Sequence, residues 1–427
     1  MVMAVLFLSF CTKSDVPRCP HSSRVVLVYM AGDNNLSGYV RDNLDAIARG
    51  MVSAPAGGRT IIYVDTPGAN PRLVEVTASD TKTLHLWPGP HNSASAATMR
   101  EAISLVRTLA PADRYGLVLW SHGLAWVPSW AAGYLTGSKV RMTEPLPPTK
   151  QDGAADILLP ADPLVMATEP APAGFLFRSF RPQTKWFGQD TGESPAGYLD
   201  TEQFSEAIPS GMFDWILFDA CFMASAETLY ALRDKADRIV CSPAEVIADG
   251  FPYEQIMAEL LRSSPDLRAV CESYYRRYAE HAQSSYRSAA VSLIETSELE
   301  ALAAATASVL GAALKADPEA LACMDLSRIQ PLDRYRRHFL FDMGSVAGLL
   351  EARGLVSASL VEVWRGQLAR TVIYEAHTPS MLGLALDECC GLSMYVPAAA
   401  YADLNAYYRT LDWYARCYSM NESVCGE

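Results

Sequence analysis

The chain has little positive charge and lacks the motifs of several common protein classes. Its 35 lysines and arginines against 48 aspartates and glutamates give a net charge of −13. Such a balance argues against nucleic-acid binding, which depends on neutralising phosphates. A GxSxG elbow, a GxGxxG turn after a strand, a P-loop and an HExxH motif are all missing from the sequence. Their absence argues against α/β-hydrolases, nucleotide-binding proteins and zinc peptidases of the HExxH type.

Metal-binding spacing is also missing. The ten cysteines include no Cys-x-x-Cys pair and no Cys/His cluster with zinc spacing. We therefore expect no metal site. Cys241 follows a strand-like run and is expected to be a core thiol. His338 follows two arginines and is expected on a solvated face, whereas His281 and His377 are expected at helix ends.

Long apolar runs are rare as well. Residues 1–10 (MVMAVLFLSF) are too few to span a bilayer and lead directly into Cys11. This pattern is similar to a bacterial lipoprotein signal with Cys11 as the lipid-bearing residue, although a secretory leader or a buried first strand would have the same composition. Residues 1–23 are thus expected to be signal and tether of an exported cell-envelope protein that meets the membrane only through this anchor. We expect no later segment to be apolar for long enough to span a membrane.

The overall composition is that of an ordinary globular protein, and strand-like and helical segments alternate along the chain. Half of the 427 residues are apolar and 19% are charged, which suits one large domain or two smaller ones. Strand-like runs alternate with helical patterns through the first part of the chain. This order predicts an α/β fold whose mostly parallel sheet is flanked by helices in a three-layer sandwich. The predicted strands lie at 24–30, 59–64, 115–120, 213–218 and 238–240, with a short edge or hairpin strand at 84–87. The predicted helices lie at 36–48, 94–109, 200–208 and 224–234.

The pattern changes twice along the chain. Residues 128–197 are rich in proline and glycine, and so long an irregular stretch is usually functional or mobile. We assign 24–262 to a main domain that contains this insertion, and 263–427 to a mainly helical subdomain. That subdomain is predicted to return strands to the main sheet. Its strand-like pieces are 289–294 and 391–397, and its helical pieces are 267–280, 297–315 and 357–376. A further helix is predicted at 253–261, just before the boundary.

Two of the predicted strands end in a reactive residue. The run 115–120 is followed by Ser121, His122 and Gly123, and the run 213–218 by Asp219, Ala220 and Cys221. The carboxyl ends of parallel strands share one edge of the sheet, where ligands bind. We therefore expect His122 and Cys221 to meet there. A thiol beside an imidazole can perform nucleophilic acyl transfer, so the sequence predicts a cysteine peptidase.

The surroundings of these two residues favour the same chemistry. The Cys221 sulfur is expected to face a cleft at the start of a helix, whose dipole favours a thiolate. The backbone N–H groups of Gly123 and Cys221 are predicted to form an oxyanion hole. No third catalytic member is apparent. Without their pairing, Cys221 would be read as a packing residue and His122 as a structural histidine.

Several segments resemble one family. The points of similarity are YMAGDNNL at 29–36, LWSHG at 119–123, FDACFM at 218–223, SPAE at 242–245 and DGFPY at 249–253. They are similar to clostripain-like peptidases, a branch of the caspase-fold cysteine peptidases. The resemblance covers residues 25–253, with further similarity at 391–397 (GLSMYVP). It implies a caspase-like sheet, a Cys221–His122 dyad, and protein or peptide substrates that are cut after arginine or lysine.

The resemblance also implies residues outside the dyad. Asp219 and Asp249 match the acidic residues of the primary pocket, although Asp219 would also suit a strand-end carboxylate and Asp249 a turn before Gly250. Family members are often activated by cleavage between the histidine and cysteine strands. The 128–197 segment is expected to have this role, with Lys139 and Lys150 among the candidate sites. Some relatives need calcium; no EF-hand-like loop is present, so calcium stays open and no cofactor is assigned.

Two alternatives to this interpretation remain. One is a non-catalytic surface module of the same fold that binds basic peptides. The other is a peptidase with a different side-chain preference, because the 128–197 segment is long enough to reshape the pocket.

Overall fold

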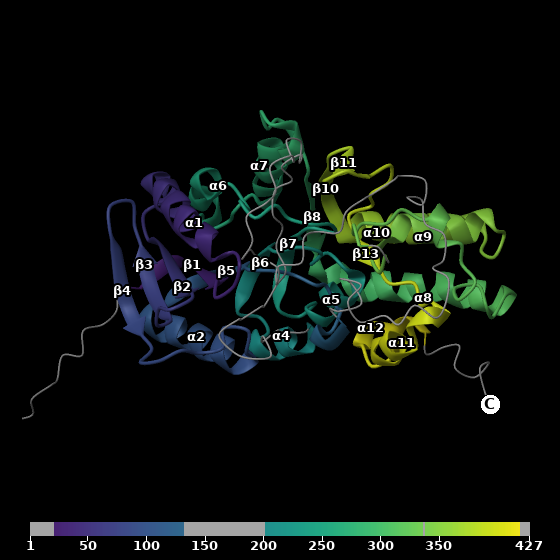
Figure 1. The fold of residues 1–427 in the computed structure, drawn as a ribbon, viewed down its shortest axis with the longest axis horizontal. Helices are drawn as coiled ribbons and strands as arrows, with labels where there is room; N and C mark the ends of the chain where they lie inside the picture. Colours follow the sequence, from purple (N-terminus) through teal and green to yellow (C-terminus); the bar gives the residue numbers. More distant parts are fainter. Residues whose placement is uncertain (1–20, 132–200, 336–337, 419–427) are drawn as a thin grey trace, which may run out of the picture.

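A nine-stranded mixed sheet runs through the protein (Figure 1), and two of its central strands lead into the segments that carry His122 and Cys221. The structure is a computed structural model that describes residues 21–131, 201–335 and 338–418. The strand order is β10-β8-β7-β6-β5-β1-β2-β3-β4. These strands are β1 (Ser22–Ala31), β2 (Gly58–Asp65), β3 (Arg72–Val76), β4 (Thr81–Leu86), β5 (Ala112–Trp120), β6 (Phe213–Asp219), β7 (Ala236–Cys241), β8 (Ala290–Glu295) and β10 (Val372–His377).

The centre of the sheet is parallel and its two edges are antiparallel. Strands β2, β1, β5, β6 and β7 run parallel to their neighbours. Both faces of these strands are covered, which is why they appear in the sequence as continuous apolar runs. Residues 25–31 of β1, for example, are fully buried. The predicted parallel strands are therefore confirmed, together with the α/β class.

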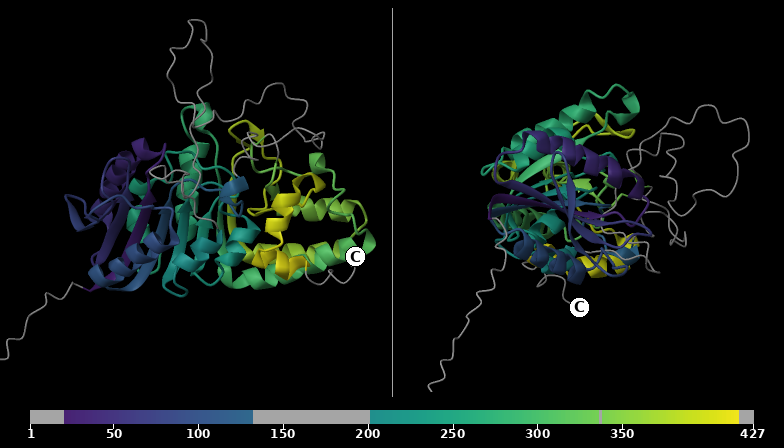
Figure 2. Two further views of the ribbon diagram at one scale, coloured as in Figure 1. Left: turned by 60° about the horizontal axis from the view of Figure 1, so that its bottom comes forward. Right: turned by 90° about the vertical axis from the view of Figure 1, so that its left-hand side faces the viewer.

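Helices cover both faces of the sheet (Figures 1 and 2). One face carries α1, α6 and α7, and the other carries α2, α4 and α5. This is the predicted three-layer arrangement. The helices are α1 (Ser37–Gly50), α2 (Ala96–Leu109), α4 (Thr201–Ala207), α5 (Ala226–Ala231), α6 (Tyr253–Leu260) and α7 (Leu267–Ala279).

The C-terminal part adds helices beside the sheet and two strands to its edge. Its helices are α8 (Leu299–Ala316), α9 (Met343–Ala352), α10 (Ala358–Thr371), α11 (Ala402–Tyr408) and α12 (Asp412–Tyr418). Strand β8 forms where a strand was predicted at 289–294. The helix predicted over 357–376 is wrong in its last part, because it ends at Thr371 and β10 follows. The run Val372, Ile373 and Tyr374 consists of residue types that favour strands.

The edges of the sheet contain further differences from the prediction. Only a short strand was predicted at 84–87, whereas β3 and β4 form a complete antiparallel hairpin. The strand predicted at 391–397 is reduced to β13 (Ser393–Met394), which pairs with β9 (Phe341–Asp342) outside the main sheet. A second small pair joins β11 (Ser380–Met381) to β12 (Leu384–Ala385).

Helix α8 is both long and apolar. Together with the preceding turn it covers 296–316 and is long and apolar enough to cross a membrane by length and composition. The expectation that no later segment reaches this length was therefore wrong. The helix packs against α10 and α12, and 44% of its most apolar window is buried within the protein. A core helix of a globular protein has these contacts.

A buried carboxyl group links α5 to the C-terminal helices. Glu227 is 2% exposed and accepts hydrogen bonds from the Tyr395 N–H at 2.9 Å and the Tyr408 hydroxyl at 3.2 Å. Burial raises the pKa of Glu227 to about 7, although these hydrogen bonds oppose the shift. Below this pH the protonated form therefore predominates in the folded chain.

This shift predicts a stability that depends on pH. Because the folded-state pKa of Glu227 lies above the usual 4.5, its contribution is fully present below about pH 4.5 and is lost as the pH rises through about 7. The loss amounts to about 3 kcal/mol of unfolding free energy. Denaturant unfolding across this range should show a smaller decline in Glu227→Gln. The matched control is Glu206→Gln, at an exposed position of α4, which should keep the wild-type slope. Equal slopes in all three proteins would contradict the assignment.

Candidate active site

The predicted reactive residues follow two adjacent parallel strands. Trp120 at the end of β5 pairs with Asp219 at the end of β6. His122 and Cys221 each lie two residues further along, so both are at the same carboxyl edge of the sheet. Both side chains are buried. The prediction that the two segments converge at this edge is confirmed.

Gly123 allows the two segments to approach closely. A Cβ atom at this position would overlap the carbonyl oxygen of Cys221 and lie 3.0 Å from its backbone nitrogen. These contacts involve backbone atoms, which cannot rotate away as a flexible side chain can. Only glycine fits here, which explains the residue type that follows His122.

The loop after β1 is tied to the end of β5. The Ser121 hydroxyl donates to the Ala31 carbonyl at 2.8 Å, and the Asn34 side-chain amide donates to the same carbonyl at 3.0 Å. The Asn34 Oδ1 atom in turn accepts the Leu36 N–H at 2.8 Å. These bonds fix the loop that carries Asn35 beside His122.

Asn35 is a partner of His122 that the sequence analysis did not identify. Its Oδ1 atom lies 2.5 Å from Nε2 of His122. An amide oxygen only accepts hydrogen bonds, so Nε2 carries a proton and Nδ1 is the basic nitrogen of the neutral ring. The available signal was the position of the GDNN loop after β1, the strand that pairs with β5. Detecting it required the strand order.

The environment of Cys221 differs from the prediction in two respects. Its side chain has no exposed surface, and α5 begins only at Ala226. The sulfur therefore neither faces an open cleft nor lies at a helix N-terminus. Phe222, which lies between Cys221 and α5, has a left-handed backbone conformation (φ 63°), so the helix does not begin directly after Cys221. The sulfur instead accepts the Val246 N–H at 3.1 Å and lies 3.6 Å from the Val246 carbonyl oxygen.

The segment that contacts Cys221 is anchored to the C-terminal part of the chain. Glu245, next to Val246, forms a buried ion pair with Arg334 at 2.6 Å. The neighbouring Tyr335 ring lies 5.9 Å from the Phe222 ring. Removing one partner of such a buried pair would leave the other charge uncompensated, which would lower the stability of the fold. Residues on both sides of the 262/263 boundary thus contribute to the surroundings of the thiol.

The loop that supplies Arg334 is organised by a buried histidine–carboxylate pair. His338 is 6% exposed, and its Nδ1 atom lies 2.9 Å from Asp333 Oδ1. Asp333 also accepts the backbone N–H groups of Phe339 and Leu340 at 2.8 and 2.9 Å. The prediction of a solvated His338 was wrong, because the adjacent arginines did not indicate this internal carboxylate.

The two predicted pocket carboxylates lie in different environments. Asp219 is completely buried and accepts the Tyr253 hydroxyl at 2.8 Å and the Phe251 N–H at 3.4 Å. It therefore holds the start of α6 against the end of β6. Asp249 is partly exposed. Burial, together with the charge of Asp249, raises the pKa of Tyr39 and of Tyr286.

Other predicted features have simpler outcomes. Cys241 is a buried core thiol, as expected, and burial raises its pKa. Cys11 and the candidate cleavage residues Lys139 and Lys150 lie outside the described residues. The same holds for all but the first few residues of the 128–197 insertion.

Comparison with known proteins agrees with this architecture. The chain is similar over 93% of its length to an inactive zymogen C11 protease from Parabacteroides distasonis, with 27% identity, 98% of that chain covered and a TM-score of 0.72. A secreted C11 cysteine protease from Bacteroides thetaiotaomicron, solved with an irreversible peptide inhibitor, has 25% identity and a TM-score of 0.70, with 94% of this chain and all of that chain covered. No curated protein matches the chain.

The fold and these similarities define a cysteine peptidase with caspase-like architecture. The model of the clostripain family matches residues 28–135 and 174–421. The chain therefore belongs to the clostripain family.

Proposed function

We propose that the protein is an exported endopeptidase that cleaves after arginine or lysine, with Cys221 as nucleophile and His122 as its base. The observation that carries the proposal is the close approach of the β5 and β6 ends, where Gly123 contacts the backbone of Cys221. Family membership supports the peptidase class. The acidic residues near this edge support the preference for basic residues.

The reaction follows from the arrangement of His122. Asn35 holds the proton on Nε2, so Nδ1 takes the proton of the Cys221 thiol as sulfur attacks the scissile carbonyl carbon. The carbonyl oxygen becomes an oxyanion that accepts from the N–H groups of Gly123 and Cys221. The imidazolium then protonates the departing amine, and a thioester forms. Water, deprotonated by the same imidazole, hydrolyses the thioester and releases the thiol.

The substrate side chain is assigned to the region of Asp249. A partly exposed carboxylate suits a guanidinium or ammonium group, which donates a charged hydrogen bond to it. The charge of Asp249 adds to burial in raising the pKa of the Tyr39 and Tyr286 hydroxyl groups. Asp219 is buried and contributes by fixing Phe251 and Tyr253, which follow Asp249 in the chain.

The buried thiol implies an activation step. Because Cys221 has no exposed surface, a peptide carbonyl reaches the sulfur only after the surrounding segments move. Cleavage within 128–197, at Lys139, Lys150 or a neighbouring basic residue, is the proposed trigger. Export is supported by the secreted description of the B. thetaiotaomicron relative. Cys11 is proposed to carry a lipid anchor.

The proposal is tested with three fluorogenic peptides that differ only in the residue before the cut: arginine, lysine or the uncharged citrulline. The wild-type protein, incubated until its own processing is complete, should cleave the first two and leave the citrulline peptide largely intact. His122→Ala should cleave none of them. A protein that binds the basic peptides without cleaving them would support the non-catalytic module instead. Equal cleavage of all three would support a different preference.

Asn35 provides a second, finer test of the proposed base. Asn35→Ala removes one hydrogen bond from His122 and should reduce kcat/KM by about tenfold, in line with ~1–1.5 kcal/mol for such a bond. Its melting temperature should stay unchanged because Asn35 is exposed. Asn35→Asp should move the acidic limb of the pH–rate profile to higher pH, since a carboxylate stabilises the imidazolium. An unshifted profile would show that Asn35 does not orient the base.

A further inference from the structure

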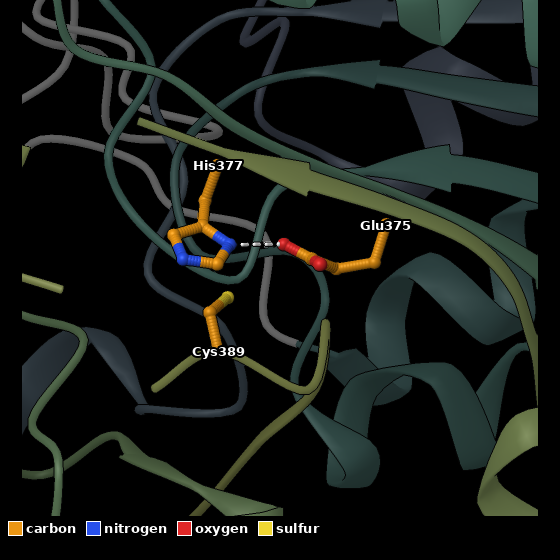
Figure 3. Close-up of side chains that lie close together, drawn as sticks. All are labelled: Glu375, His377 and Cys389. Atoms are coloured by element: carbon orange, nitrogen blue, oxygen red, sulfur yellow. Dashed lines mark hydrogen bonds and ion pairs between the residues drawn. The ribbon is translucent and has the colours of Figure 1, made fainter. Parts of the chain in front are cut away.

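Three potential metal ligands converge at the edge of the main sheet, away from the Cys221 thiol. They are Glu375, His377 and Cys389, which we call the β10-edge cluster (Figure 3). One ligand atom from each residue lies within 4.8 Å of the other two. All three residues are partly exposed. Figure 3 shows the three side chains pointing toward one another.

The strand geometry places two of these residues side by side. Glu375 and His377 are alternate residues of β10, so their side chains emerge from the same face of the strand. His377 Nδ1 lies 2.6 Å from Glu375 Oε1. The expectation that His377 caps a helix was wrong, and its place in the strand creates this pair.

The loop that supplies Cys389 is fixed to the same edge. The Ser292 hydroxyl of β8 donates to the Gly391 carbonyl at 2.7 Å, and the Cys390 N–H donates to Asp342 at 2.6 Å. Gly391 has φ +87°, and a Cβ there would lie 2.8 Å from the Ser292 hydroxyl and 3.0 Å from the Glu375 side chain. Only glycine allows the loop to lie this close to β10. The backbone that follows Cys389 is therefore fixed beside β10.

We propose that the β10-edge cluster binds one divalent transition-metal ion of the zinc type. His377 Nδ1, a Glu375 carboxylate oxygen and Cys389 Sγ would be the protein ligands. Nitrogen and sulfur donors are preferred by zinc and its neighbours, whereas calcium and magnesium take oxygen ligands. Three protein ligands leave the fourth tetrahedral position to water. On binding, the thiol releases its proton to solvent, the Nδ1 proton of His377 is transferred through solvent to Nε2, and the Glu375–His377 hydrogen bond is replaced by two metal bonds.

Binding at this position would reinforce a connection between the sheet edge and the Cys221 loop. After Cys389 the chain continues to Ser393, whose N–H donates to the Ala224 carbonyl at 3.0 Å. The ion would therefore cross-link β10 to the segment that pairs with residues just after Cys221. A search of the sequence for closely spaced zinc ligands could not find the cluster, because its ligands come from a strand and from a separate loop.

The test uses the full chain carrying Cys221→Ala, because the Cys221–His122 pair could itself bind thiophilic metals. Zn²⁺ or Co²⁺ alone is titrated against it and followed by calorimetry and absorption. We expect one ion per chain, a thiolate-to-cobalt charge-transfer band and a higher melting temperature. Adding Cys389→Ser should abolish the band, and adding His377→Ala should weaken binding by more than about 100-fold. Adding Cys323→Ser, at an exposed cysteine elsewhere, should change neither.

Three results would overturn the proposal: no binding to the Cys221→Ala chain, a cobalt–thiolate band that survives Cys389→Ser, or unweakened binding after His377→Ala. Circular dichroism of each variant shows whether a loss of binding reflects unfolding. Because the titration uses a chain without the proposed nucleophile, its outcome is independent of whether the peptidase proposal holds.

Discussion

Replacement of Cys221 by alanine is expected to reduce kcat/KM for arginine and lysine peptides by at least about 10⁴-fold, as for other covalent nucleophiles. Without the sulfur, no thioester forms, and the remaining N–H groups can only polarise the carbonyl. If the protein normally cleaves itself, the uncleaved chain should also accumulate in this variant. Initial rates and gel analysis of the purified proteins measure both effects.

The matched control for this substitution is Cys241→Ala. Cys241 ends the neighbouring strand β7 and is equally buried, with a pKa raised by that burial. Its removal deletes a core thiol without touching the proposed chemistry, so activity should be retained with a small loss of stability. Turnover that persists in Cys221→Ala, or an equal loss in Cys241→Ala, would rule out Cys221 as the nucleophile.

The second large effect is expected from Asp249→Asn. Removing this charge should reduce kcat/KM for an arginine peptide by about 100-fold, because truncating a charged pair in a partly desolvated site costs ~2–5 kcal/mol. The citrulline analogue has the same shape without the charge, so its slow cleavage should hardly change. The ratio of the two rates therefore isolates the electrostatic contribution from general damage to the site.

Asp266→Asn serves as the control for Asp249→Asn. Asp266 caps α7 by accepting the Ala269 N–H at 3.0 Å, and asparagine caps helices equally well. Its activity and selectivity should match those of the wild type. If Asp249→Asn lowers the arginine and citrulline rates by the same factor, Asp249 supports the loop and does not contact the substrate side chain.

The parallel core and the convergence of the site were predictable from the sequence. Strands buried on both faces leave continuous apolar runs, and the residues directly after such runs must share one edge of the sheet. That reasoning brought His122 and Cys221 together over a long separation in the chain. It depended only on local patterns and on the topology of parallel sheets.

The features that could not be predicted depend on contacts between distant segments. The Asn35–His122 hydrogen bond requires knowing that β1 lies beside β5. The burial of Cys221 depends on the Val246 segment, which the Glu245–Arg334 pair ties to the C-terminal part. The helix predicted over 357–376 included the residues of β10, so the place of His377 in a strand was not predicted.

The most direct measurement is covalent labelling of the processed protein with a chloromethyl ketone that carries arginine, followed by peptide mapping. We predict complete loss of activity with a single adduct on Cys221, and no adduct when His122 is replaced by alanine. Inactivation with the adduct on any other cysteine, or labelling of Cys221 that does not depend on His122, would contradict the proposed dyad.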